Sequence, residues 1–155
     1  MKEESINIQK LHHFVNGAQV AGTSDRFGDV FNPALGAVVK QVPLASKGEV
    51  EAAIASAQEA FPGWAATPAG RRAQVMFNFR DLIRSNMDEL AELVSSEHGK
   101  TLDDAKGSIT RGLEVVEYAC GISQVLKGEF SPSVASGVDS WNLRQPLGVC
   151  AGITP

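Results

Sequence analysis

Between residues 13 and 43, apolar positions come in short runs separated by turn residues, a pattern typical of short β-strands. The segment Phe14-Val15-Asn16-Gly17 ends in an Asn-Gly pair, which favours a hairpin because both residues tolerate positive φ. The segment Asn32-Pro33-Ala34-Leu35-Gly36 predicts a second turn, in which the proline fixes φ and the last glycine supplies a flexible exit. Val38–Pro43 then predicts a strand that ends at its proline.

From residue 46 onward, apolar positions recur every three or four residues, which predicts amphipathic helices. Ser46 and Glu49 have the spacing of a capping box, so we expect the first helix to begin there and to end at Pro62-Gly63. Thr67-Pro68 predicts the start of a second helix, with the threonine hydroxyl as cap and the proline at the first helical position. A break in this helical stretch is expected near Ser85-Asn86.

The second helical stretch is expected to end at His98, because Gly99 suits the left-handed position after a helix. Thr101 is expected to cap a further helix, with Asp104 at its third position. The apolar positions of the helices predict stripes that face a core. They are Val50, Ala53, Ile54, Ala57 and Phe61; then Val75, Met76, Phe79, Leu82, Ile83, Met87, Leu90, Leu93 and Val94; then Leu102, Ala105, Ile109, Leu113, Val116, Ala119 and Cys120.

The stretch 127–146 has few large apolar side chains, and Val138–Arg144 alternates in polarity, which predicts a two-stranded ribbon with one wet face. Because an isolated ribbon is marginal in water, it needs support, and a dimer partner is one candidate. Leu147–Ile153 does not alternate and predicts a strand buried on both faces of a parallel sheet, with a short antiparallel edge strand as the alternative. Since no crossover helix follows, we expect the sequence to be a fragment of a longer protein.

Composition narrows the classes of partner. The 155 residues contain 14 basic and 18 acidic side chains, for a formal charge of −4, which disfavours binding to nucleic acid or an anionic membrane surface. No apolar run approaches the roughly 18–20 residues that span a bilayer. The segment Met1–Ser5 resembles neither a secretory signal nor a transit peptide, so a cytoplasmic protein is expected.

The reactive side chains do not assemble into a complete catalytic constellation. Cys120 and Cys150 lack a CxxC spacing and lie in apolar runs, which predicts buried thiols instead of a disulfide or a zinc site. His12, His13 and His98 do not show the spacing of metal ligands, so no metal is expected.

Two segments remain as candidate binding sites. Glu97–Thr101 joins two predicted helices and could bind an anion, although capping of the helix junction explains the same residues. Arg111 lies near the stripe of its helix between Gly107 and Gly112, and each helix glycine is unfavourable by about 1 kcal/mol relative to alanine. Close packing or a cavity would account for these glycines, and an arginine there could clamp a carboxylate. The alternative is a surface arginine paired with Asp104, Glu114 or Glu117.

Taken in order, the motifs resemble the N-terminal part of the aldehyde dehydrogenase superfamily. The matching segments cover nearly everything after residue 12, and the ordered set is far more specific than any one member. They are Asn32–Gly36, Val42–Val50, Ala60–Trp64, Glu97–Thr101 and Arg144–Pro155. The segment Gly107–Cys120 is similar to one branch, the CoA-acylating methylmalonate (malonate) semialdehyde dehydrogenases.

The resemblance implies an α/β fold that is the N-terminal part of an aldehyde dehydrogenase subunit. Residues 1–126 would be short strands and long helices belonging to the NAD-binding domain. Residues 127–146 would form a two-stranded oligomerisation ribbon, and 147–155 the truncated first strand of the doubly wound NAD-binding sheet. The full-length enzyme would be a homo-oligomer, either a dimer or a tetramer.

The resemblance also implies the reaction. In this family a cysteine thiolate attacks the aldehyde and hydride passes to NAD. In this branch carbon dioxide is lost and the acyl group passes to CoA, so that (methyl)malonate semialdehyde gives propionyl-CoA or acetyl-CoA. Arg111 matches an arginine that holds the substrate carboxylate, and Ile153, Thr154 and Pro155 match the start of the segment that lines the cofactor cleft.

The nucleophilic cysteine and the acid/base glutamate of the family have no match in this sequence. We therefore expect no catalytic residue in these 155 residues and no dehydrogenase activity from them alone. Two alternatives remain: a non-catalytic association module, and an aldehyde dehydrogenase of another substrate specificity.

Overall fold

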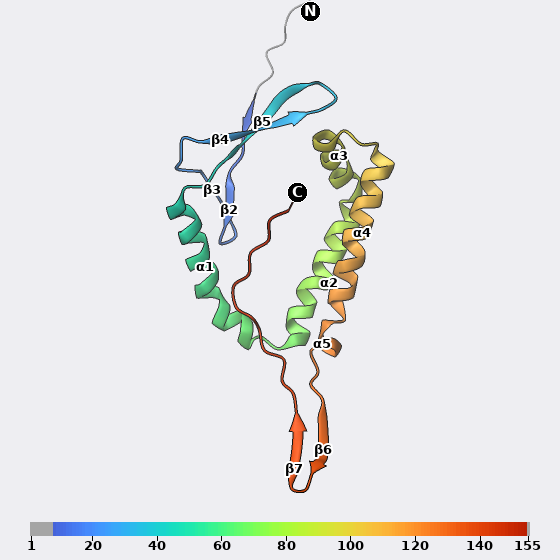
Figure 1. Cartoon of the computed structure of the whole chain (residues 1–155). Helices are drawn as coiled ribbons and strands as arrows, with labels where there is room; N and C mark the ends of the chain where they lie inside the picture. Colours follow the sequence, from blue (N-terminus) through green and yellow to red (C-terminus); the bar gives the residue numbers. More distant parts are fainter. Residues whose placement is uncertain (1–7, 155) are drawn as a thin grey trace, which may run out of the picture.

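The computed structural model describes residues 8–154, whose strands and helices lie around the C-terminal run (Figure 1). The strands are β1 (Gln9–Lys10), β2 (His13–Val15), β3 (Ala18–Val20), β4 (Phe27–Asn32), β5 (Ala37–Pro43), β6 (Phe130–Ala135) and β7 (Val138–Trp141). The helices are α1 (Lys47–Ala66), α2 (Ala69–Ser85), α3 (Met87–His98), α4 (Leu102–Cys120) and α5 (Ile122–Val125). Strands, long helices and a ribbon therefore follow in the predicted order.

The N-terminal strands form two small sheets. β4 and β5 are antiparallel, and β1 pairs with the other edge of β5 in parallel. β2 and β3 form a separate hairpin whose turn is Asn16-Gly17, with φ of 51° and 76°, so the predicted Asn-Gly turn is confirmed. The sequence pattern does not reveal β1, because two residues are too few to show a period.

The second predicted turn lies between β4 and β5. Asn32 Oδ1 accepts hydrogen bonds from the backbone N–H groups of Ala34 and Leu35, at 3.0 and 3.3 Å. Gly36 leaves the turn with a φ of 63°, a left-handed conformation that glycine adopts without strain. As predicted, β5 ends at Pro43.

The capping box at the start of α1 is confirmed. The Glu49 N–H donates to Ser46 Oγ at 3.3 Å, and the Ser46 N–H donates to Glu49 Oε2 at 2.7 Å. The prediction that Pro62-Gly63 ends this helix is wrong, because α1 continues to Ala66. Pro62 removes one backbone donor without ending the helix. Thr67 is the C-cap, and its ψ of 127° is the extended conformation favoured before a proline.

The prediction that the Thr67 hydroxyl caps α2 is also wrong. Thr67 Oγ1 donates instead to the Gly63 carbonyl at 2.9 Å, which satisfies an acceptor in the last turn of α1. Helix α2 begins at Ala69 without a side-chain cap. Adjacent helices compete here for one hydroxyl, and the sequence alone does not show which of them obtains it.

The other helix boundaries agree with the sequence. The break at Ser85-Asn86 separates α2 from α3, and α3 ends at His98. Gly99 follows with a φ of 82°, the left-handed conformation expected of a residue that ends a helix. The Thr101 hydroxyl accepts from the Asp104 N–H at 3.4 Å and caps α4 as predicted.

The core of the described residues lies where α4 packs against α2 and α3. The buried apolar residues are Ala73 on α2, Ala91 on α3, and Ala105, Leu113, Val116 and Cys120 on α4. Four members of the predicted α4 stripe are therefore buried. Most of these side chains are small, so the backbones of the three helices approach closely.

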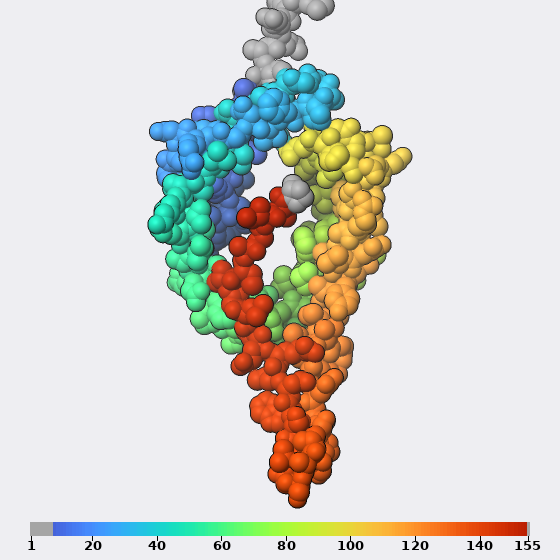
Figure 2. All heavy atoms as spheres, in the orientation of Figure 1, coloured from blue at the N-terminus to red at the C-terminus, as the bar shows by residue number. Residues whose placement is uncertain are grey.

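The predicted stripes of α1 and α2 are not fully covered. No residue of α1 is buried, and Val50 and Ile54 on α1 and Phe79 and Leu82 on α2 are exposed. Figure 1 shows the reason: α1 stands apart from the α2–α4 group, and an opening lies between them in the space-filling view (Figure 2). Helix periodicity identifies an apolar face, but it does not say whether a partner element is present to cover it.

The predicted ribbon forms. β6 and β7 pair antiparallel, with Phe130 opposite Trp141, and project away from the rest of the chain (Figure 1). All positions of both strands are exposed. At the base, the Asn142 N–H donates to the Glu129 carbonyl at 3.1 Å, and the Glu129 N–H donates to Asn142 Oδ1 at 3.0 Å.

Residues 147–154 do not form the predicted buried strand. This run passes between α1 and the other helices without any assigned strand, and Leu147 and Ile153 are fully exposed (Figure 1). A parallel strand is stable only when neighbouring strands accept and donate its backbone hydrogen bonds. Within residues 8–154 no strand lies beside this run, which explains why its apolar sequence stays unpaired.

None of the helices in residues 8–154 combines the length and apolar character that crossing a bilayer requires.

Candidate functional site

Arg111 lies on the exposed side of α4, opposite the face that carries the buried Leu113 and Val116. Its Nη2 donates to Ser108 Oγ at 3.1 Å, one turn earlier on the same helix. Two of the three acids proposed as alternative partners pair with other cations: Asp104 with Lys100, and Glu117 with Arg84. The third, Glu114, forms no ion pair with Arg111 in the part of the chain that the structure describes. Within the described residues, no ion pair involves Arg111, so its charge faces solvent with its hydrogen-bonding fork largely unused.

A polar cluster joins the start of α4 to Arg111. Lys100 Nζ lies 2.7 Å from Asp104 Oδ2 and donates to Ser108 Oγ at 2.8 Å. The hydrogen bond and charge of Lys100 hold the pKa of Asp104 below its usual range, with smaller contributions from the charges of Arg111 and His98. Asp104 is therefore a carboxylate that compensates Lys100, while the charge of Arg111 remains available.

The two glycines beside Arg111 do not mark close packing within the described residues. A Cβ added at Gly112 would meet nothing within 4 Å, and one at Gly107 would meet only Arg111 Nη1 at 3.9 Å. The close-packing explanation is thus not supported by the contacts present. What the structure does show is that the Arg111 side chain lies back along α4 towards Gly107.

The segment Glu97–Thr101 is a capped helix junction. Ser95 Oγ donates to the Lys100 carbonyl at 2.7 Å, and Glu97 Oε1 lies 2.9 Å from Nζ of Lys40 on β5. Because Asp104 compensates Lys100, the junction does not present the free cation that an anion site needs. Of the two interpretations left open by the sequence, the geometry favours capping.

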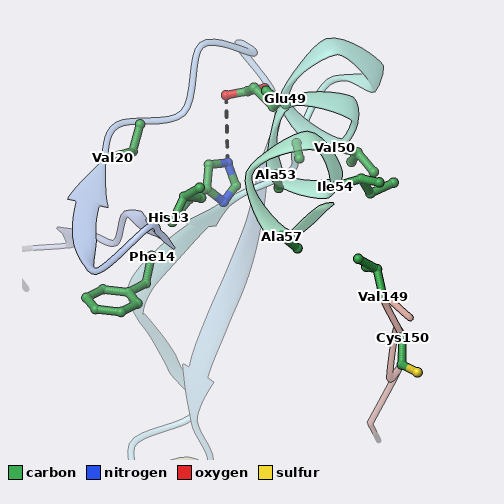
Figure 3. A pocket seen from close by; sticks show the side chains of 13 residues that line it. His13, Phe14, Val20, Glu49, Val50, Ala53, Ile54, Ala57, Val149 and Cys150 are labelled. Carbon is green, nitrogen blue, oxygen red and sulfur yellow. Dashed lines mark ion pairs between the residues drawn. The ribbon is translucent and has the colours of Figure 1, made fainter. Parts of the chain in front are cut away.

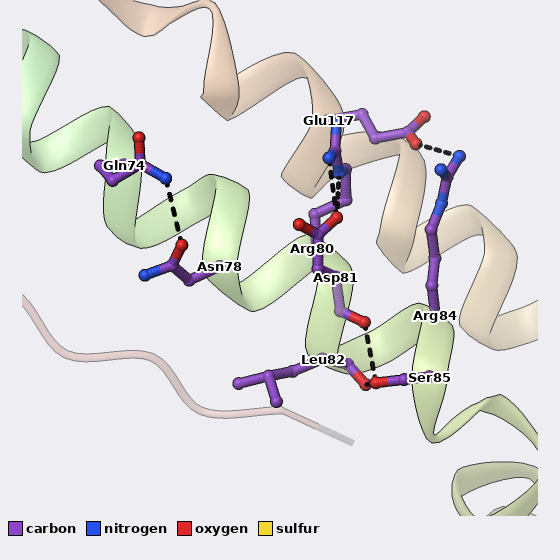
Figure 4. A network of polar contacts seen from close by, with 8 residues as sticks. All are labelled: Gln74, Asn78, Arg80, Asp81, Leu82, Arg84, Ser85 and Glu117. Atoms are coloured by element: carbon purple, nitrogen blue, oxygen red, sulfur yellow. Dashed lines mark hydrogen bonds and ion pairs between the residues drawn. The ribbon is translucent and has the colours of Figure 1, made fainter.

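A second polar network joins α2 to α4 (Figure 4). Arg84 Nη2 lies 2.9 Å from Glu117 Oε1, and Arg80 pairs with its neighbour Asp81 at 2.7 Å. The hydrogen bond to Asp81 raises the pKa of Arg80 above its usual value. The sequence does not predict the pair between α2 and α4, because its members lie far apart along the chain and only helix packing brings them together.

An apolar cavity lies between α1, the β2–β3 hairpin and the C-terminal run (Figure 3). It has a volume of about 490 Å³, and its lining is apolar except for His13, Glu49 and Cys150. His13 Nε2 lies 3.8 Å from Glu49 Oε1 and has no hydrogen-bond partner among the described atoms. An apolar cavity of this kind suits covering by further apolar side chains better than binding of a charged ligand.

Glu49 is the polar anchor of this region. Besides the Ser46 N–H, its carboxylate accepts the Thr23 N–H at 2.7 Å, so one side chain both caps α1 and ties it to the segment before β4. These backbone hydrogen bonds lower the pKa of Glu49 from 4.5 to about 2. The sequence predicts the capping role, but the bond to Thr23 appears only in the tertiary structure.

We expect Glu49→Gln to destabilise the chain at neutral pH and to lose this effect in acid. Because folding lowers the pKa of Glu49, its contribution is complete above about pH 4.5 and disappears as the pH falls through about 2. Urea unfolding of the wild type and the variant between pH 7 and pH 2 measures this. Glu51→Gln is the control, since Glu51 forms only an exposed ion pair with Lys47. A difference between wild type and Glu49→Gln that does not vary with pH would contradict the assignment.

The two cysteines have different environments. Cys120 is buried on α4, as predicted, whereas the prediction of a buried Cys150 is wrong because its thiol is exposed. Burial of Cys150 was expected from the strand 147–153, which does not form here. Across residues 8–154, no three His, Cys, Asp or Glu side chains gather in a way that could hold a metal ion.

The residues matched to the cofactor cleft do not form a dinucleotide site by themselves. Ile153 and Thr154 are exposed in the unpaired run, and Pro155 lies outside the described residues. A Cβ added at Gly148 or Gly152 would meet nothing within 4 Å, so no other segment of the described residues approaches these two glycines closely. The described residues therefore do not fit NAD on their own.

Residues 20–155 match the aldehyde dehydrogenase family. The chain is 48% identical over 145 residues to the malonate-semialdehyde dehydrogenase of Pseudomonas aeruginosa, covering 94% of this chain and 29% of that protein. It is 49% identical over 146 residues to the acylating, mitochondrial methylmalonate-semialdehyde dehydrogenase of Arabidopsis thaliana, covering 94% of this chain and 24% of that protein. The chain belongs to the aldehyde dehydrogenase family, and it spans less than a third of the length of these relatives.

A solved structure shows the same arrangement. A candidate methylmalonate-semialdehyde dehydrogenase from Sinorhizobium meliloti 1021, complexed with NAD, superposes with a TM-score of 0.93 at 50% identity. The superposition covers 97% of this chain and 31% of that one. The expected fold class, the N-terminal part of an aldehyde dehydrogenase fold, is thereby confirmed.

Proposed function

We propose that these residues form the N-terminal part of an NAD-dependent, CoA-acylating semialdehyde dehydrogenase. It would oxidise malonate or methylmalonate semialdehyde, release carbon dioxide and transfer the acyl group to CoA, giving acetyl-CoA or propionyl-CoA. The observation that carries this proposal is the 48% identity to a malonate-semialdehyde dehydrogenase over 94% of the chain. Identity spread over the whole chain argues for shared function better than one isolated motif does.

Arg111 is proposed to bind the substrate carboxylate. Its support is geometric: an exposed guanidinium on α4 that forms no ion pair with an acid among the described residues. A guanidinium can donate two parallel hydrogen bonds to a carboxylate. The carboxylate is the group that distinguishes malonate semialdehyde from an uncharged aldehyde.

Ile153, Thr154 and Pro155 are proposed to enter the NAD cleft, as residues 147–155 would be the first strand of the cofactor sheet. The support is that residues 147–154 pair with no strand among the described residues and leave apolar side chains exposed, as expected of a strand whose neighbours are not in contact with it. This exposure also disfavours the association-module alternative, which would have satisfied these residues internally. Residues 1–126 are proposed to belong to the NAD-binding domain and residues 127–146 to form the oligomerisation segment of a dimer or tetramer. The exposed ribbon at Phe130–Trp141 lies within this second segment and supports the proposal.

A cytoplasmic location is part of the same proposal. The chain has 18 acidic and 14 basic side chains and two free cysteines, and both features are compatible with a cytoplasmic location. The Arabidopsis thaliana relative is a mitochondrial protein by its name, so organelle and cytoplasm are to be distinguished by localising the tagged full-length protein.

Replacing Arg111 by alanine tests the proposed function. In the complete enzyme, we expect the KM for malonate semialdehyde to rise about 10- to 100-fold, since a hydrogen bond to a charged group contributes about 1.5–3 kcal/mol. The KM for propanal, which has no carboxylate, should not change. NADH formation in the presence of CoA is the measurement, and Arg71→Ala, at an exposed arginine on α2, is the control.

Two results would contradict the proposal. An unchanged KM for malonate semialdehyde in Arg111→Ala would remove the substrate role and favour a dehydrogenase of other specificity. NADH formation by residues 1–155 alone would contradict the expectation that the nucleophile lies outside these residues.

A further inference from the structure

Ser108 occupies the centre of the cluster beside Arg111. Its Oγ accepts one hydrogen bond from Lys100 Nζ at 2.8 Å and another from Arg111 Nη2 at 3.1 Å. Two cationic side chains, one from the α3–α4 junction and one from α4, thus converge on a single hydroxyl. The Ser108 side chain is therefore held in place by two charged donors and does not simply face solvent.

The hydrogen-bonding capacity of the hydroxyl decides what it can still do. A serine hydroxyl has two acceptor lone pairs and one donor hydrogen. Because Lys100 and Arg111 both donate to this oxygen, its hydrogen points away from the two cations and can be donated to a further acceptor. A donor beside a guanidinium presents two adjacent donors, which is the arrangement that a carboxylate binds.

The charge balance of the cluster favours one anion. Asp104 Oδ2 lies 2.7 Å from Lys100 Nζ and compensates its charge. Lys100 is held firmly, with its side chain only 16% exposed, so it orients the hydroxyl without competing for the ligand. One positive charge, that of Arg111, then remains for one carboxylate.

We propose that Ser108 completes the carboxylate subsite of Arg111. Its oxygen positions the guanidinium, and its hydroxyl hydrogen donates to the second oxygen of a short-chain carboxylate. This inference rests on the proposed role of Arg111 and adds a specificity residue that the sequence does not single out. Lys100, which is paired with Asp104, acts through Ser108 as a positioning residue.

The test is a comparison of variants in the complete enzyme. Ser108→Ala is expected to raise the KM for malonate semialdehyde about 5- to 20-fold, with kcat and the KM for propanal changed by less than about twofold. Ser108→Thr keeps the hydroxyl and should restore most of the affinity, which a purely structural defect would not allow. Thr110→Ala is the matched control, because Thr110 Oγ1 donates to the Lys106 carbonyl at 2.9 Å and not to Arg111.

The outcomes separate this inference from the proposed function. If Arg111→Ala raises the KM for malonate semialdehyde and Ser108→Ala does not, the role of Ser108 is overturned and that of Arg111 stands. If neither variant raises it, the carboxylate subsite itself is overturned. Equal losses with malonate semialdehyde and propanal in Ser108→Ala would also overturn the inference, since they would report a general structural defect.

Discussion

Replacing Leu113 by alanine is expected to lower the free energy of unfolding of the chain by about 2–5 kcal/mol. Leu113 is 8% exposed and is the largest of the buried side chains in the helical core. Truncation removes its apolar atoms from a site where α4 packs against α2 and α3 and leaves a cavity that the helix backbones fill only in part. Urea unfolding followed by circular dichroism measures the change, with a lower midpoint and an unchanged slope.

Val115→Ala is the control for this experiment. Val115 lies two residues further along α4 but is 68% exposed, so its truncation should change the free energy of unfolding by no more than about 0.5 kcal/mol. The comparison separates loss of packing from any change in helix propensity. Equal losses for the two variants would contradict the assignment of the core to this face of α4.

Gly99→Ala is expected to lower the free energy of unfolding by about 2–4 kcal/mol, through two separate effects. Gly99 has a φ of 82°, a conformation unfavourable for alanine by about 1–2 kcal/mol. A Cβ at this position would lie 2.8 Å from Pro33 Cγ, so the junction after α3 or the turn after β4 must move. Denaturant unfolding again measures the loss.

Gly36→Ala isolates the contact with Pro33. Gly36 has a φ of 63°, but an added Cβ would meet nothing within 4 Å, so only the backbone penalty of about 1–2 kcal/mol applies. The excess loss in Gly99→Ala reports the contact between the β4–β5 turn and the α3–α4 junction. A loss in Gly99→Ala no greater than that in Gly36→Ala would show that this contact contributes nothing.

Local features of the fold were predictable because their causes lie within a few residues. The Asn16-Gly17 turn, the capping box of Ser46 and Glu49, and the cap at Thr101 each depend on side chains that bond to nearby backbone groups. The errors at Pro62 and Thr67 are also instructive. Pro62 is tolerated inside α1, which continues to Ala66, whereas the Thr67 hydroxyl donates to the Gly63 carbonyl of the preceding helix. In both cases local propensity allows two outcomes.

The candidate site was predictable only in its leading residue. Arg111 stands out from the sequence because it lies between two helix glycines, and the family resemblance gives it a role. Ser108 gives no such signal. Lys100 lies in the candidate segment Glu97–Thr101, but its contact with Ser108 depends on how the α3–α4 junction lies against α4. The bond from Thr23 to Glu49 was hidden for the same reason, as it joins residues separated by 26 positions.

The amino-acid sequence is enough to predict the order of strands, helices and ribbon, the apolar faces of the helices, and the aldehyde dehydrogenase family. These features are predictable because periodicity, turn chemistry and motif order are properties of neighbouring residues. Which of these faces are covered depends on how the helices pack, and in the folded chain Leu113 is buried while Val50 and Leu147 are exposed. Burial requires a second element in contact, and that contact is made in space between residues that are distant in the chain.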